Sequence, residues 1–229
     1  MIKKIITISL VFSLLLCSLS FAESEDVSGR VSSGNINSGD AIKEEPGNFS
    51  GSIIVTGDSY GGFFISYLKQ YGYNIEKNKY NRAQKSVIEN EPIYRLAFIT
   101  GFNNIVLSIG VNDYFNQTPS YAFANVIENL ASLGKYYNKR LFLHSYLSIP
   151  YQVENAKYTC DDYDIALRQI AAKYDNVEYI DILYLSNNKE YLQDDLIHYN
   201  DKMYSILYEK INNIILNDNK EKKVIMNNY

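Results

Sequence analysis

The sequence predicts an α/β protein built as a three-layer α/β/α sandwich, in which a parallel sheet of five strands lies between two layers of helices. Short β-branched runs alternate along the chain with amphipathic segments of ten or more residues. Such alternation is typical of parallel strands joined by right-handed helical crossovers. The composition agrees with a globular domain, since 46% of the 229 residues are hydrophobic and 21% are charged.

The expected strands are short apolar runs, two of which are stopped by glycine, and they span residues 52–57, 73–76, 104–109, 140–145 and 177–182. The expected helices show apolar side chains at helical spacing, and they span residues 61–71, 120–137, 163–174 and 202–216. Ligands of such sheets bind outside the carboxyl ends of the strands. We therefore expect functional residues in the loops after the first, third and last strands.

The first 22 residues are typical of a secretory signal peptide. Lys3 and Lys4 precede an apolar run from Ile5 to Leu19, and Ala22 ends a cleavage site of small residues. An uncleaved anchor is the alternative, although the run is shorter than the ~20 residues that span a bilayer comfortably. Cleavage after Ala22 predicts a secreted or cell-surface protein without stable membrane insertion.

The rest of the chain divides by composition. Residues 23–48 are rich in Ser, Gly, Asn, Asp and Glu, so we expect a flexible linker there. The folded domain is expected to span residues 49–217, and a polar tail to follow over 218–229.

Charge and cysteine content exclude several classes of protein. A formal net charge of −4 argues against a phosphate-binding surface, and thus against nucleic acid as a partner. Two cysteines, Cys17 and Cys160, are too few for a disulfide scaffold or a cysteine-based zinc site. A structural metal is therefore not expected. Cys160 precedes two aspartates that should raise its pKa, so we expect an inert thiol.

Two strand ends carry candidate catalytic residues. Gly57-Asp58-Ser59-Tyr60 places the Ser59 hydroxyl at the start of a helix, where N–H groups favour developing negative charge; an ordinary helix cap is the alternative. Gly110-Val111-Asn112-Asp113 follows the third strand, and the Asn112 amide could donate to an oxyanion or simply build a turn.

The third candidate group is Asp195-Leu196-Ile197-His198. A serine nucleophile needs a base within hydrogen-bond reach and a carboxylate that orients the base, and this segment supplies both. The chain has only two histidines, and His144 lies within an apolar strand, where a hydrogen-bonded core histidine is expected. His198 is therefore the candidate base, and a catalytic zinc or iron site is not expected.

These three segments, in this order, resemble the SGNH/GDSL hydrolase superfamily from about Phe49 to Leu216. The resemblance implies Ser59 as nucleophile, Asn112 in the oxyanion hole, and Asp195 and His198 as the other triad members. It also implies a flavodoxin-like sheet and ester hydrolysis or acyl transfer without a cofactor.

The chain departs from the family pattern at two positions. The second block of the family contributes a glycine whose N–H completes the oxyanion hole, but no glycine lies between Gly72 and Gly101. The corresponding loop is expected at residues 81–86, with Lys85 or Ser86 as the candidate donor. In the fifth block, Leu196 stands where glycine is common.

The sequence thus predicts a secreted serine esterase that acts on small acyl groups, with acetyl esters of extracellular or cell-wall polysaccharide as the expected substrates. An O-acyltransferase using the same residues and a catalytically silent glycan-binding domain are the alternatives. Asp58 and Asp113 are interpreted as structural residues that hold the loops. The 22 tyrosines are expected mainly in the core and on the surface, with sugar stacking as the less favoured role.

Overall fold

Four parallel strands form one sheet in the computed structural model, which describes residues 53–72, 84–147, 149–186 and 188–226. They pair in chain order, and they are β1 (Ile53–Gly57), β2 (Asn104–Ser108), β3 (Arg140–His144) and β4 (Val177–Ile180). All four were expected from the sequence. The fifth expected strand, at 73–76, lies outside the described residues.

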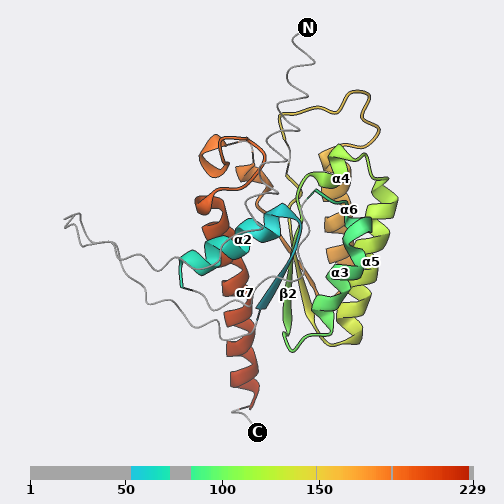
Figure 1. Cartoon of the computed structure of the whole chain (residues 1–229). Coiled ribbons are helices and arrows are strands. Elements are labelled where there is room, and N and C mark those ends of the chain that lie inside the picture. Colours follow the sequence, from blue (N-terminus) through green and yellow to red (C-terminus); the bar gives the residue numbers. More distant parts are fainter. Residues whose placement is uncertain (1–52, 73–83, 148, 187, 227–229) are drawn as a thin grey trace, which may run out of the picture. The chain divides into compact units, whose positions relative to one another are not determined.

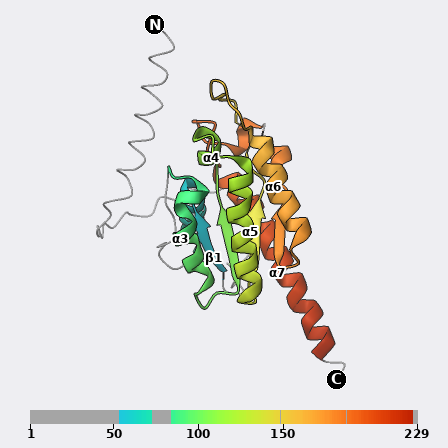
Figure 2. The same cartoon turned by 90° about the vertical axis from the view of Figure 1, so that its right-hand side faces the viewer.

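Helices cover both faces of the sheet (Figure 1). One face carries α2 (Ser59–Gln70) and α7 (Asp201–Met226). Figure 2 faces the other layer, formed by α3 (Val87–Phe98), α5 (Ser120–Tyr136) and α6 (Cys160–Lys173). The expected three-layer α/β/α sandwich is therefore confirmed. A short helix, α4 (Asn112–Phe115), and two 3₁₀ turns, η1 (Leu183–Leu185) and η2 (Lys189–Tyr191), lie in the loops.

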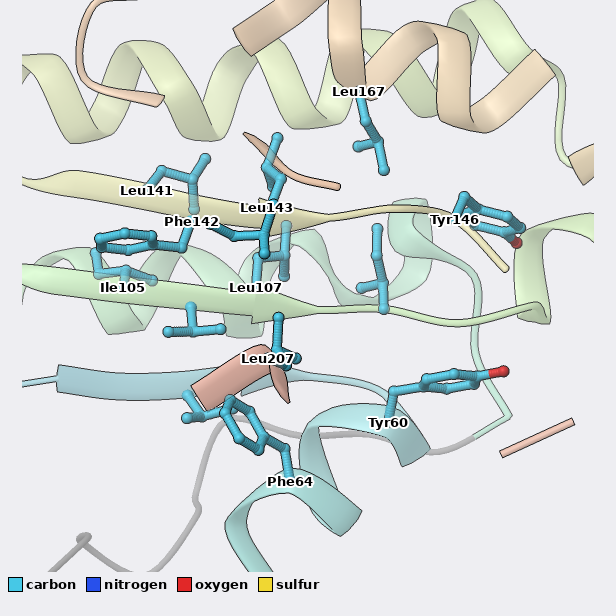
Figure 3. Packing of buried hydrophobic residues seen from close by; sticks show 14 of the residues in the cluster. Tyr60, Phe64, Ile105, Leu107, Leu141, Phe142, Leu143, Tyr146, Leu167 and Leu207 are labelled. Atoms are coloured by element: carbon cyan, nitrogen blue, oxygen red, sulfur yellow. The ribbon is translucent and has the colours of Figure 1, made fainter. Parts of the chain in front are cut away.

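The sheet is apolar on both faces because each face is covered by helices. Its central residues, such as Ile105, are fully buried. Figure 3 shows Phe64 and Leu207 packed from one side of the sheet and Leu167 from the other. This continuous core holds the strands rigidly, and their carboxyl ends present the loops that carry the candidate residues.

Helix α3 was not expected from the sequence. Its apolar spacing is weak and Pro92 lies inside it, but a capping box begins it. The Glu89 N–H donates to the Ser86 hydroxyl oxygen at 3.4 Å, and the Ser86 N–H donates to the Glu89 carboxylate at 3.1 Å. The Ser-x-x-Glu spacing of residues 86–89 was the sequence signal for this helix.

The last helix is longer than the sequence predicts. The expectation of an end at Leu216 and a polar tail over 218–229 rested on apolar spacing, but α7 continues to Met226. Lysine and glutamate have high intrinsic helix propensity, so a polar segment rich in them can extend a helix that the core has already started. Among the described residues, no helix is both long and apolar enough to cross a membrane.

Candidate active site

The candidate residues lie at the starts of α2 and α4, just beyond the carboxyl ends of β1 and β2, and in the segment that precedes α7. The turn after β1 depends on Gly57, which has a φ of +152°. A Cβ at this position would lie 1.8 Å from the Ser108 carbonyl oxygen, so only glycine permits this approach of β1 to β2. The turn then makes Ser59 the first residue of α2, where backbone N–H groups have no partner within the helix.

Ser59, His198 and Asp195 form one continuous hydrogen-bonded chain. The Nε2 atom of His198 lies 3.0 Å from the Ser59 Oγ, and its Nδ1 lies 2.6 Å from the Asp195 Oδ2. A carboxylate accepts, so Nδ1 carries the proton and Nε2 can accept the proton of the serine hydroxyl. The structure therefore brings together the three residues that the sequence singles out as a triad.

The loop between Asp195 and His198 folds so that its backbone N–H groups bind the Asp195 carboxylate. The Asp195 Oδ1 accepts the backbone N–H groups of Ile197 and His198, each at 2.9 Å. Leu196 has a φ of +55°, in the left-handed region that favours glycine. Glycine adopts this conformation without strain, whereas leucine bears a cost of about 1–2 kcal/mol there.

The contacts of the Asp195 carboxylate favour its charged form. Burial raises the pKa of its carboxyl, but hydrogen bonds from the His198 side chain and from the backbone of His198 and Ile197 outweigh this effect. The pKa therefore lies below its ordinary value. The Asp195 side chain is 43% exposed and that of His198 only 10%, so the histidine is the more buried partner of the pair.

Asp58 orients the Asn112 amide. The Asp58 Oδ2 accepts the Asn112 Nδ2–H at 2.8 Å and the Gly110 N–H at 2.9 Å, and its Oδ1 accepts the Tyr60 N–H at 2.9 Å. Burial raises the pKa of Asp58, while these hydrogen bonds lower it. An amide nitrogen carries two protons, so the proton of Asn112 that Asp58 does not bind is the one an oxyanion could accept.

Asp113 has the structural role expected for it. Its two carboxylate oxygens lie 3.1 and 3.2 Å from the Val87 nitrogen and accept its N–H, which ties the start of α3 to α4. Burial raises the pKa of Asp113 to about 7.

Ser86, one of the two candidates for the third oxyanion donor, has its N–H bound within the protein. The Ser86 N–H donates to Glu89 within the capping box, and the Lys85 Nζ lies 2.8 Å from the same carboxylate. The Ser86 N–H is therefore not free for a substrate while the box is formed. The contact of Lys85 with Glu89 is made by its ammonium group and not by its backbone N–H.

Three aromatic residues contact the segment of residues 195–198, the candidate catalytic loop, and were not identified from the sequence. The Tyr60 hydroxyl donates to the Ile197 carbonyl, and the Tyr151 hydroxyl donates to the Asp195 carbonyl at 3.1 Å. The Phe63 ring meets the His198 imidazole edge-on at 4.9 Å. Of the three, only Phe63 could have been found from the sequence, because a residue four positions after Ser59 lies on the same face of a helix.

His144 is a hydrogen-bonded core residue, as expected. Its Nδ1 lies 2.9 Å from the Ser145 carbonyl oxygen, and its Nε2 lies 2.9 Å from the Ser108 hydroxyl. Burial lowers its pKa to about 4, so it stays neutral. Burial and the neighbouring Asp161 raise the pKa of Cys160 to about 11, which agrees with an inert thiol. Among the described residues, no group of acidic, histidine and cysteine side chains could hold a metal ion.

Comparisons with protein-family models and with curated protein sequences gave no match. Solved structures do match. A GDSL-like lipase from Bacteroides thetaiotaomicron aligns with a TM-score of 0.59 and 16% identity over 72% of this chain and 88% of its own. A variant of an acetyl-xylooligosaccharide esterase from Geobacillus has a TM-score of 0.54 and 15% identity over 72% and 94%. An acetyl xylan esterase has a TM-score of 0.52 and 18% identity over 69% and 96%. The described domain therefore has the fold of the SGNH/GDSL hydrolases, which its sequence motifs predict.

Proposed function

We propose that the protein is a serine ester hydrolase that removes small acyl groups. The observation that carries this proposal is the chain of hydrogen bonds from Ser59 through His198 to Asp195. A nucleophile, a base and an orienting carboxylate are the three groups that acyl transfer through a serine requires.

The proposed reaction proceeds through an acyl-enzyme. The Ser59 Oγ attacks the ester carbonyl carbon while its proton moves to the His198 Nε2, and the imidazolium then gives this proton to the departing alcohol. Water attacks the acyl-enzyme in the second step, with His198 again as base. The Ser59 N–H at the start of α2 and the Asn112 amide are the proposed donors to the oxyanion.

We further propose acetyl esters of extracellular or cell-wall polysaccharide as substrates, and a secreted or cell-surface location. Two of the similar structures are acetyl xylan or acetyl-xylooligosaccharide esterases, which supports this substrate class. Partly exposed Phe63 and Tyr151 beside the catalytic loop add apolar rings of the kind that pack on sugars. The signal-like segment of residues 1–22 supports the location.

One observation favours a catalytically silent domain instead. The second-block glycine is replaced, and the N–H of the candidate Ser86 is bound by Glu89. An oxyanion hole with two donors would still stabilise the tetrahedral intermediate, since each such donor contributes about 10²–10³-fold to kcat. We therefore expect a working enzyme.

The test is covalent labelling with a fluorophosphonate, followed by hydrolysis of 4-nitrophenyl acetate, butyrate and octanoate and of acetylated xylan. We expect labelling of the wild type and of Ser66→Ala, which changes an exposed serine on the same helix, and no labelling of Ser59→Ala. Acetate is expected to be the best ester. Absence of both labelling and hydrolysis in the folded wild type would instead support the silent domain.

A further inference from the structure

We propose that Tyr60 is a positioning residue for His198, so that the residue after the nucleophile also holds the base in place. The inference rests on the proposed ester hydrolysis. It concerns how two loops that are far apart in sequence keep the Ser59 Oγ and the His198 Nε2 at the 3.0 Å that proton transfer needs.

Tyr60 contacts the catalytic loop through both its hydroxyl and its ring. The hydroxyl donates to the Ile197 carbonyl, which belongs to the peptide group directly before His198. The ring centroid lies 5.3 Å from that of the imidazole, with the two planes tilted by 43°. One side chain therefore restrains the backbone of the base and one side of its ring.

Tyr60 is itself fixed from three directions. Its N–H donates to Asp58, its carbonyl accepts the Tyr204 hydroxyl at 3.1 Å, and the Tyr199 ring packs edge-on against its ring at 4.9 Å. Only 1% of Tyr60 is exposed. Figure 3 shows its side chain at the carboxyl end of the strands, with the hydroxyl pointing away from the aliphatic core.

The loop after β2 leaves space for this ring. A Cβ on Gly110 would lie 1.8 Å from the Tyr60 ring, so the glycine lets the ring lie against the loop that also carries Asn112. Tyr60 follows Ser59 in α2, and its side chain thus contacts both the loop at Gly110 and the segment of residues 195–198.

This arrangement has a kinetic consequence. His198 must meet the Ser59 hydroxyl in the transition state, and a misplacement of about 1 Å can cost ~10²-fold in rate. Loss of the Tyr60 hydroxyl leaves the Ile197 carbonyl without its donor and frees the peptide group before His198. Substrate binding does not depend on this contact, so kcat should fall and KM should not change.

The experiment compares Tyr60→Phe with Tyr199→Phe in the full chain. Both tyrosines are buried, and the Tyr199 hydroxyl binds the Ser145 carbonyl at 3.4 Å rather than the catalytic loop. With 4-nitrophenyl acetate, we expect Tyr60→Phe to lower kcat by about 10- to 100-fold at constant KM. The rate of fluorophosphonate labelling should fall by the same factor, and Tyr199→Phe should keep the wild-type kcat.

Thermal unfolding separates positioning from stability. Both variants are expected to lose a few degrees in Tm, so a kcat loss confined to Tyr60→Phe cannot come from stability alone. If Tyr60→Phe does not fold, Tyr204→Phe replaces it, because it removes the donor to the Tyr60 carbonyl and should lower kcat at constant KM. Wild-type kcat in folded Tyr60→Phe, or an equal loss of kcat in Tyr199→Phe, would overturn the positioning role. The proposed ester hydrolysis is judged separately, by the activity of the wild type.

Discussion

Two adjacent aspartates, Asp194 and Asp195, precede the proposed catalytic histidine, and only their contacts distinguish them. The Asp195 carboxylate binds the His198 Nδ1 through one oxygen and two backbone N–H groups through the other. Asp194 is exposed. The pair therefore offers a substitution and a matched control at neighbouring positions.

We predict that Asp195→Asn lowers kcat on 4-nitrophenyl acetate by about 10²-fold or more. The new amide can still accept the two backbone N–H groups through its oxygen, so the loop should keep its shape. Its NH₂ group, however, would face the His198 Nδ1 and favour the tautomer with a proton on Nε2, which cannot act as base. Asp194→Asn should stay within about twofold of the wild type. The reverse result would assign the carboxylate role to Asp194.

The first residues of α3 are hydrogen-bonded to the segment that carries Asn112, the proposed oxyanion donor. The capping box of α3 binds the Ser86 N–H to Glu89, and the next N–H, of Val87, binds Asp113, which follows Asn112 in α4. The stability of this helix and the shape of the site are therefore linked through consecutive backbone groups.

Ser86→Ala and Ser86→Pro separate the cap from the N–H group. Both remove the capping hydroxyl, which should cost about 1 kcal/mol in the free energy of unfolding. Only proline also removes the N–H, and the Ser86 φ of −64° suits proline. Because Glu89 already binds that N–H, we predict that kcat/KM for the two variants agrees within about threefold. An additional loss of ~10²-fold in the proline variant would instead make Ser86 an oxyanion donor.

Burial of two ionisable groups, Asp113 and His144, makes the stability of the fold depend on pH in opposite directions. Burial raises the pKa of Asp113 to about 7, with Asp58 and Glu89 adding to the effect and hydrogen bonds from Val87 and Thr118 opposing it. Burial lowers the pKa of His144 to about 4. Between about pH 4 and 6.5, rising pH thus weakens the fold through Asp113 and strengthens it through His144, because the unfolded chain titrates near the ordinary values.

Asp113→Asn should isolate one of these responses. The folded wild type keeps the Asp113 proton that the unfolded chain has lost between about pH 4 and 7, so this stabilisation is complete below pH 4 and disappears as pH rises through 7. Asparagine has no such proton. We predict that the free energy of urea unfolding of Asp113→Asn, relative to the wild type, increases from pH 5 to pH 8. A constant difference across this range would show that Asp113 titrates normally.

The sequence alone was enough for the alternation of strands and helices, the three-layer sandwich and the order of the candidate residues. Each of these depends on neighbours along the chain: apolar periodicity defines an element, and the polar residues that follow Gly57 or Gly110 must emerge at a strand end. Two separate motifs also singled out Ser59, Asp195 and His198, which the structure joins by hydrogen bonds, and their catalytic roles stay a proposal. The strand expected at 73–76 stays a prediction.

Tertiary structure alone decided the interactions between segments that are distant in sequence. The buried tyrosines show this best: Tyr60 and Tyr204 lie in the core and bind backbone carbonyls of other segments, and nothing in a local pattern names those partners. The engagement of the Ser86 N–H and the opposite pKa shifts of Asp113 and His144 have the same origin. Hydrogen bonding and desolvation depend on which groups the folded chain brings together, whereas periodicity records only which face of an element is buried.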